Sequence, residues 1–145
     1  MFNSFSKRAS WLTYLGMVPF LICALAIVHG FEQEKTVFIL RAYAAVIVSF
    51  ISGIHWGISM KDTEHQTQWL LISSNIITLL AWASLLMPNA ISALLTLSAL
   101  LILLVCIDSK LYSMRQIDVW FMKLRWRATL CVVISLVASS LMLSP

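Results

Sequence analysis

Charged residues are scarce in this chain. Of its 145 residues only 11% are Asp, Glu, Lys or Arg, whereas 61% are hydrophobic and the mean hydropathy is +0.92. Soluble domains carry roughly 25% charged residues, so this composition excludes a water-soluble globular domain. The formal net charge of +4 could suggest a nucleic-acid partner, but the charges lie between long apolar runs, as they do in membrane loops. We therefore expect the lipid bilayer to be the partner and exclude nucleic acid.

Glycine, proline and cysteine are also few, at four, three and three residues. So little glycine and proline excludes a fibrous or disordered protein. The cysteines, Cys23, Cys106 and Cys131, lie inside apolar runs without a C-x-x-C spacing, which excludes a disulfide framework or a zinc site. We interpret them as small buried apolar residues.

Motifs of catalysis and of cofactor binding are absent as well. The sequence contains no phosphate-binding loop, nucleophile elbow or zinc-protease helix. A bis-histidine haem site is excluded because we expect His29 at the opposite surface from His55 and His65 in a loop. We expect no cofactor and no metal, and we assign no catalytic residue.

Five long apolar runs account for most of the chain. At a rise of 1.5 Å per residue each run approaches the thickness of the hydrocarbon core. A cleaved signal peptide is the alternative for the first run, but that run has 18 residues and four more runs follow it. We predict an all-α membrane protein, a bundle of five transmembrane helices forming one domain over 1–145, with spans near 11–28, 39–60, 69–87, 90–107 and 126–143.

The basic residues indicate how these spans are oriented. Cytoplasmic loops carry an excess of Lys and Arg. With a cytoplasmic N-terminus, eight of the ten basic residues lie on the cytoplasmic side, and only Lys35 and Arg41 lie on the other. The sequence therefore predicts a multi-pass protein of the bacterial inner membrane with its N-terminus in the cytoplasm and its C-terminus in the periplasm.

The longest polar connection, 108–127, mixes apolar and basic residues. Such a mixture is typical of an amphipathic helix in the headgroup region. We predict an interfacial amphipathic segment between the fourth and fifth spans. It is either an ordinary linker or a docking site for an anionic lipid or a membrane-protein partner.

The stretch 49–60 in the second span carries two ridges of small and polar side chains. At 100° per residue, Ser49, Gly53 and Gly57 lie along one line of the helix. Small residues at this spacing allow another helix to approach closely. We interpret this ridge as a helix-packing surface, either within one chain or in a homo-oligomer. The second ridge, which offers hydrogen bonds, consists of Ser52, His55 and Ser59.

Polar side chains from four spans should meet at the cytoplasmic end of the bundle. A polar group buried in lipid needs a partner. In the structural interpretation His55 pairs with Asn75 or a serine, and Asp108 pairs with a nearby arginine. An intramembrane ionisable residue is also a candidate functional site, so a role in ligand binding or proton relay stays open. The candidates are His55, Trp56, Asn75, Asp108, Arg125 and Arg127.

The chain resembles a family of small integral-membrane proteins at several points. The run Ser49-Phe50-Ile51-Ser52-Gly53-Ile54-His55-Trp56-Gly57 is similar to the family's Ser-Phe-x-Gly/Ser-Gly-x-His-Trp-Gly signature, and 14–20 is similar to its opening motif. The family is the uncharacterised bacterial and mitochondrial one (domain of unknown function 3429) that includes transmembrane protein 69. The resemblance implies a multi-span membrane protein without an established activity, and it draws attention to His55, Trp56 and Asp108.

These observations favour a non-enzymatic interaction, assembly or lipid-associated protein whose polar cluster is centred on His55. A small transporter or proton-linked carrier using His55, Asn75 and Asp108 is the alternative. A second alternative is a membrane enzyme acting on a lipid or quinone headgroup. In that enzyme His55 would be the acid or base, and Arg125 or Arg127 would hold an anion.

Overall fold

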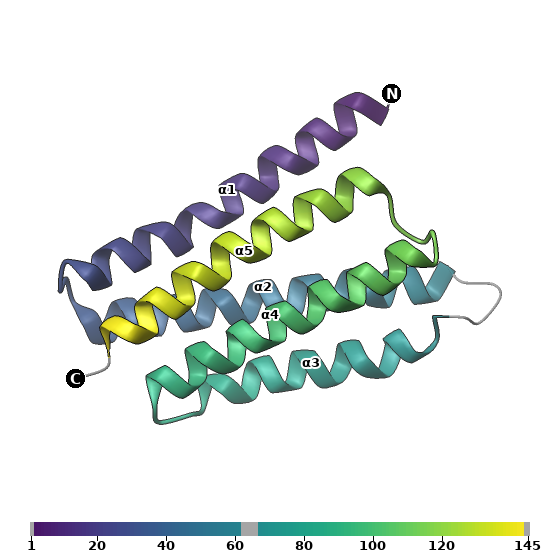
Figure 1. Cartoon of the computed structure of the whole chain (residues 1–145). Helices are drawn as coiled ribbons and strands as arrows, with labels where there is room; N and C mark the ends of the chain where they lie inside the picture. The colour runs from purple at the N-terminus through teal and green to yellow at the C-terminus, as the bar shows by residue number, and fades with distance from the viewer. Residues whose placement is uncertain (1, 62–66, 144–145) are drawn as a thin grey trace.

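The computed structural model describes residues 2–61 and 67–143, and within them it contains five α-helices. These are α1 (Phe2–Val28), α2 (Gln33–Lys61), α3 (Trp69–Leu85), α4 (Ala90–Ser113) and α5 (Val119–Met142). Successive helices run antiparallel along one common direction (Figure 1). The first residues of α1, α3 and α5 therefore lie at the end of the bundle where α2 and α4 finish. The prediction of an all-α fold is confirmed.

Four of the five helices are long and apolar enough to cross a membrane, judged by length and composition: α1, α2, α4 and α5. The remaining helix, α3, is also apolar but has only 17 residues. At 1.5 Å per residue it measures roughly 25 Å, less than the ~30 Å hydrocarbon core. The predicted third span ended at residue 87, but the helix stops at Leu85, because the chain turns ahead of Pro88.

Several helices extend beyond the apolar runs from which they were predicted. α1 begins at Phe2 and α2 at Gln33, earlier than the predicted spans by about two turns. The predicted interfacial segment over 108–127 is wrong: α4 continues to Ser113, α5 begins at Val119, and only 114–118 connect them. An apolar run predicts the part of a helix that contacts lipid. The backbone hydrogen bonds of the helix continue into polar turns beyond that run, so the helix is longer than the run. The loop that holds His65 falls in 62–66, outside the described residues.

The helix α2 lies at the centre of the bundle. It contacts α1, α3 and α4, and α5 closes the bundle by contacting both α1 and α4. Leu40, Ala44 and Val48 of α2 are fully buried. Tyr43 donates a 2.9 Å hydrogen bond to the carbonyl of Gly16, and its ring lies 5.0 Å from that of Phe20. The middle of α1 is therefore attached to α2.

Arg41 ties the start of α2 to the end of α3. Its Nη2 donates to the carbonyls of Ser84, Leu85 and Met87 at 2.8, 3.0 and 2.8 Å. The last carbonyls of a helix have no partner within it, so this guanidinium supplies the missing donors.

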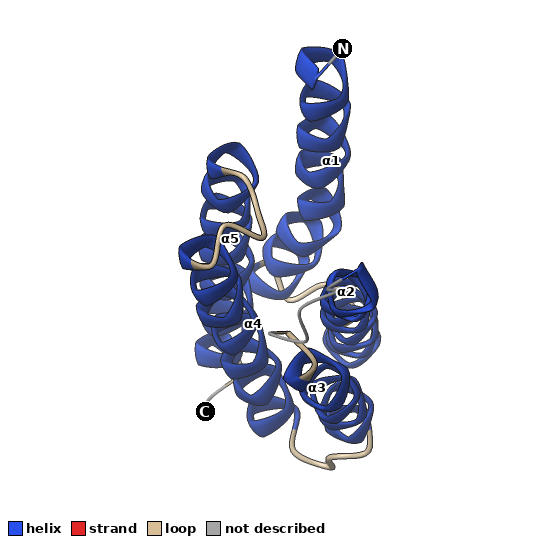
Figure 2. Cartoon of the chain, turned by 90° about the vertical axis from the view of Figure 1, so that its right-hand side faces the viewer, coloured by secondary structure: helices blue, strands red, loops and turns tan. Residues whose placement is uncertain are grey.

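The first half of α1 stands apart from α2 but stays in contact with α5, where the ring centroids of Phe5 and Trp120 lie 6.4 Å apart. Figure 2 shows the start of α1 separated from α2, while its later turns approach the other helices. Several of its large apolar side chains are exposed, among them Trp11, Leu12 and Leu15. This looser packing leaves space between α1, α2 and α5.

The two glycines of the predicted ridge of α2 make no close helix contact within residues 2–61 and 67–143. Gly53 and Gly57 are exposed, and a Cβ added at either would meet no atom of these residues within 4 Å. Within the described residues the glycines therefore do not pack against another helix, and the use of the ridge in a homo-oligomer stays a prediction. Among the cysteines, Cys23 is buried as expected, whereas Cys106 is exposed and Cys131 half-buried.

Candidate ligand-binding site

Three ionisable side chains from three helices meet inside one end of the bundle. His55 lies six residues before the end of α2, Asp108 five residues before the end of α4, and Arg125 six residues after the start of α5. Since α2 and α4 finish at the end where α5 begins, all three lie roughly 8–9 Å from that end. Because successive helices are antiparallel, the three residues lie at the same depth in the bundle.

The carboxylate of Asp108 bridges the other two side chains. Its Oδ1 lies 2.7 Å from Nε2 of His55, and its Oδ2 accepts a hydrogen bond of 2.7 Å from Nε of Arg125. The side chains of His55, Asp108 and Arg125 are 1%, 2% and 10% exposed. The expected arginine partner of Asp108 is therefore present, but His55 pairs with Asp108 and not with Asn75 or a serine.

Burial makes this cluster dependent on all of its members. Two charges removed from water are tolerated only when they are paired and their remaining hydrogen-bonding groups are satisfied. Asp108 offers one oxygen to each partner, so α2, α4 and α5 are joined through a single carboxylate. The cluster thereby fixes the register of these three helices at one end.

Two nitrogens of the cluster remain unpaired among the described residues. Nδ1 of His55 and Nη2 of Arg125 are both buried, and neither has a hydrogen-bond partner. When Nε2 of His55 carries the proton donated to Asp108, Nδ1 is an acceptor; in the imidazolium both nitrogens donate. The cluster therefore has an unused donor group at Nη2 of Arg125, and Nδ1 of His55 is left without a hydrogen bond among the described residues.

A cavity of about 480 Å³ lies beside Arg125, between α1, α2 and α5, with one contribution from α4. Its walls are formed mainly by apolar side chains, including Leu12, Met17, Ile51 and Leu124. Small-molecule sites typically have about 300–1,000 Å³ and combine apolar walls with a few polar groups. The volume and lining of this cavity match such a site.

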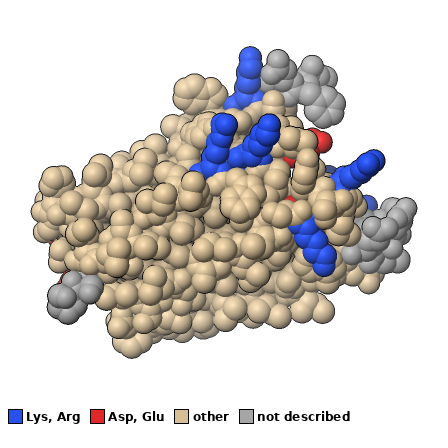
Figure 3. Space-filling view, viewed as in Figure 1, with Lys and Arg blue, Asp and Glu red and all other residues tan. Residues whose placement is uncertain are grey.

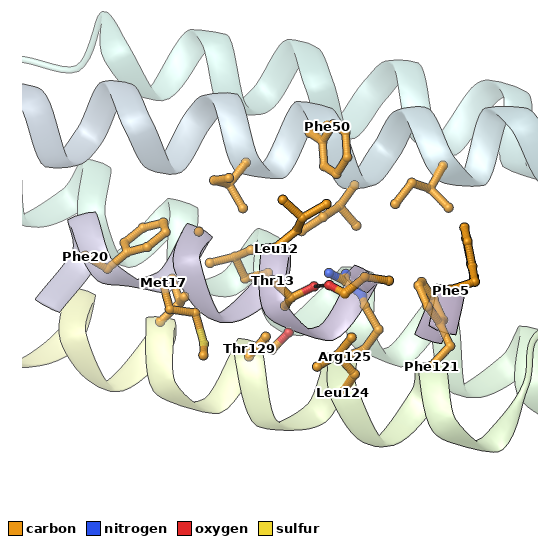
Figure 4. A pocket seen from close by; sticks show the side chains of 18 residues that line it. Phe5, Leu12, Thr13, Met17, Phe20, Phe50, Phe121, Leu124, Arg125 and Thr129 are labelled. Carbon is orange, nitrogen blue, oxygen red and sulfur yellow. Dashed lines mark hydrogen bonds between the residues drawn. The ribbon is translucent and has the colours of Figure 1, made fainter. Parts of the chain in front are cut away.

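Figure 4 shows how the side chains are arranged around this cavity. Phe5 and Phe121 lie toward one end, and Met17 and Phe20 lie toward the other. The nitrogen-bearing end of Arg125 points from α5 into the space between them. The cavity is thus an elongated apolar space with a guanidinium on its wall.

The other predicted site residues lie elsewhere. Arg127 is exposed, and Trp56 is 43% exposed, so neither side chain is part of the buried cluster. Asn75 is exposed and donates to the carbonyl of Leu71 at 2.6 Å. Trp56 and Asn75 line a separate small groove of about 200 Å³ between α2 and α3, together with Gly53. Depth alone placed Asn75 near His55, but the rotation of α3 turns it outward.

Apart from Arg125, sequence reasoning missed the residues that line the cavity. Thr13 of α1 and Thr129 of α5 place hydroxyl-bearing side chains on its wall. Thr129 follows the buried Ala128 in an apolar stretch of α5, and no pattern in the sequence singled it out. No signal in the sequence identified Thr13, since its role depends on where α1 sits.

Comparison with known proteins identifies the family. The model of the family described as "Protein of unknown function (DUF3429)" matches residues 5–141. The chain belongs to the DUF3429 family. Transmembrane protein 69 of Xenopus tropicalis is 31% identical to it over 139 residues, and transmembrane protein 69 of Mus musculus is 26% identical over 137. No solved structure matches the chain.

The match to these relatives covers nearly all of this chain but not all of theirs. It takes in 92% of the chain in both cases, and 53% and 55% of the Xenopus and mouse proteins. The chain thus spans about half the length of the curated relatives it matches. With its apolar helices, this membership makes the chain a multi-pass membrane protein of the DUF3429 family.

Proposed function

We propose that this DUF3429 protein is a non-enzymatic, lipid-associated protein that binds a lipid-like molecule in the cavity between α1, α2 and α5. The observation that supports the proposal best is the cavity itself, about 480 Å³ with mainly apolar walls and the guanidinium of Arg125 on one side. A molecule with an apolar body and one polar group would match both features. The buried His55–Asp108–Arg125 cluster holds that guanidinium in place.

The proposal includes five membrane crossings, α3 among them. The helices α2 and α4 run in the same direction and both are long enough to span. The chain leaves α2 at one end of the bundle and enters α4 at the other, so α3 has to traverse the same thickness. Its 17 residues are at the lower limit of about 17–25 for a spanning helix.

The proposal also places the N-terminus in the cytoplasm of a bacterium and the protein in its inner membrane. The Lys and Arg side chains visible in Figure 3 gather toward the end where α1 and α5 begin. An excess of basic residues favours the cytoplasmic side. The exposed basic residues of that end are Lys7, Arg8, Lys61, Lys110, Arg115, Lys123 and Arg127.

Native mass spectrometry of the protein gently extracted from its membrane tests the binding. We expect the wild-type protein to retain a lipid-like adduct, and the cavity-filling variant Ala9→Phe to lose it, because Ala9 lines the cavity. Ala83→Phe is the matched control, since Ala83 is a half-buried alanine of α3 that lies outside the cavity lining. Equal retention by all three proteins would refute the cavity as the binding site.

A proton-linked carrier is the second candidate, favoured by the unpaired Nδ1 of His55 within a buried ionisable cluster. An imidazole in such a cluster can take up and release a proton during transport. In liposomes loaded with a pH-sensitive dye, a carrier would move protons with its substrate, and His55→Gln would stop that movement while the protein stays folded. Proton movement that is unchanged in His55→Gln would remove this candidate.

A further inference from the structure

We propose that the molecule held in the cavity carries an oxyanion, a carboxylate or a phosphate, on an extended apolar chain, and that Arg125 binds the oxyanion. This inference rests on the proposed function and specifies the chemistry of its ligand. It derives from three features: the unused donor of Arg125, the basic end of the bundle and the elongated lining of the cavity.

Arg125 lines the cavity and has donors that Asp108 leaves unused. Its Nε is occupied by Asp108 at 2.7 Å, whereas Nη2 is buried and unpaired among the described residues. A buried donor without a partner costs free energy, so a ligand that accepts from it gains affinity. Guanidinium groups prefer the oxygens of carboxylates and phosphates, and charge-assisted hydrogen bonds to them are the strongest of their kind.

The electrostatic surroundings favour an anion over a neutral acceptor. The cavity extends to Phe5 and Phe121, at the end of the bundle where the exposed basic side chains gather (Figures 3 and 4). Within the described residues, the acids of that end are Asp108, which is already paired with two partners, and Asp118. The summed field of the basic residues lowers the cost of bringing a negative headgroup to Arg125.

The cavity lining follows the helices over several turns. On α1 it extends from Phe5 to Phe20, which corresponds to roughly 22 Å along the helix axis. Apolar side chains dominate this length, and among the described residues of the lining Arg125 is the only ionisable one. Such a space matches one polar head attached to an extended hydrocarbon chain.

Competition binding on the detergent-purified protein tests the headgroup. Radiolabelled palmitate is displaced with unlabelled palmitate, cetyl phosphate or cetyl alcohol, which share one alkyl chain, at a pH where the carboxyl is ionised. We expect at least one oxyanion to compete about tenfold or more better than the alcohol, the difference that one charge-assisted hydrogen bond provides. The stronger of palmitate and cetyl phosphate then identifies the head as a carboxylate or a phosphate.

Two arginines on α5 supply the matched variants. Arg125→Gln should abolish the preference for oxyanions over the alcohol, whereas Arg127→Gln should keep it, because Arg127 is exposed and two residues away. If Arg125→Gln does not fold, Arg125→Lys replaces it. Its ammonium keeps a cation opposite Asp108, but all of its donors lie on one nitrogen and cannot reach both Asp108 and the ligand as the separated nitrogens of a guanidinium can, so the preference should fall several-fold.

The outcomes separate the two proposals. Equal competition by the alcohol and both oxyanions, or a preference that survives Arg125→Lys unchanged, would overturn the oxyanion assignment and leave lipid binding in place. Absence of binding by every alkyl compound, with no adduct on the extracted protein, would overturn the proposed function together with this inference.

Discussion

At the scale of single residues, Asp108 is the member of the buried cluster on which the stability of the protein should depend most. It is 1% exposed and bonds His55 through one oxygen and Arg125 through the other. Each partner therefore has a bond that only this carboxylate supplies in the described part of the chain. The stability of the helix arrangement around it should depend on its charge.

Asp108→Asn should be strongly destabilising. The amide keeps the shape of the carboxylate but leaves the guanidinium of Arg125 buried without a counter-charge, which typically costs about 3–5 kcal/mol. Thermal or denaturant unfolding of the purified protein in detergent measures the loss. A change below about 1 kcal/mol would mean that Arg125 reaches water or another anion.

His55→Gln should be much milder. A glutamine amide can donate to Oδ1 of Asp108 in place of Nε2, so we expect a loss of about 0.5–1.5 kcal/mol, the net worth of one hydrogen bond. The same unfolding assay, run beside Asp108→Asn, gives the ranking of the two variants. A loss as large as that of Asp108→Asn would show that the imidazole contributes charge.

The sequence could identify the members of this cluster and an arginine as the partner of Asp108, but not the partner of His55. Equal depth along antiparallel helices is readable from residue counts, and it placed His55, Asp108 and Arg125 together. Depth leaves the rotation of each helix about its own axis undetermined, so the expected partner of His55 was Asn75 or a serine and not Asp108. That rotation depends on tertiary packing of nearly uniform apolar faces, which carry little periodic signal.

At the scale of elements, α2 presents an open glycine face. Because a Cβ at Gly53 or Gly57 would meet no atom of the described residues within 4 Å, Gly53→Ala and Gly57→Ala should stabilise an isolated chain by about 0.5–1 kcal/mol each, through helix propensity. Unfolding assays on the monomer measure this gain. Destabilisation, or a smaller particle on size-exclusion chromatography, would show that another copy packs against this face.

The end of α3 should depend on Arg41. Arg41→Met removes the donors to the carbonyls of Ser84, Leu85 and Met87 and should cost about 1–3 kcal/mol. Hydrogen exchange should rise in the last turns of α3. Lys35→Gln is the control, because Lys35 forms only an exposed pair with Glu32. Unchanged exchange in Arg41→Met would mean that the turn before Pro88 holds the end of α3 by itself.

Helix limits were less predictable than helix number. The five apolar runs gave the correct number of helices in the described chain, but α1 and α5 begin well before their runs. Polar residues such as Lys7 and Lys123 fit a helix as readily as apolar ones. Hydropathy therefore predicted the apolar part of each helix and missed the polar turns at the N-terminal ends of α1 and α5.

At the scale of the whole molecule, the topology can be tested with single cysteines in a variant lacking the three native ones. Gln33→Cys and Pro88→Cys should react with a membrane-impermeant thiol reagent added to intact cells, because both exposed positions lie at the end opposite the basic side chains. Ser113→Cys should react only after permeabilisation. Labelling of Pro88→Cys from the inside alone would mean that α3 does not cross.

Because α1 is loosely packed, it determines the route by which a ligand would enter the cavity. This helix forms one wall of the cavity, and most of its large apolar side chains are exposed. The His55–Asp108–Arg125 bridge joins α2, α4 and α5 and leaves α1 outside it. Exchange past α1 would take a molecule sideways out of the surrounding leaflet without passing through water. Occupancy would then follow the mole fraction of that molecule among the lipids, and not its concentration in the aqueous phase.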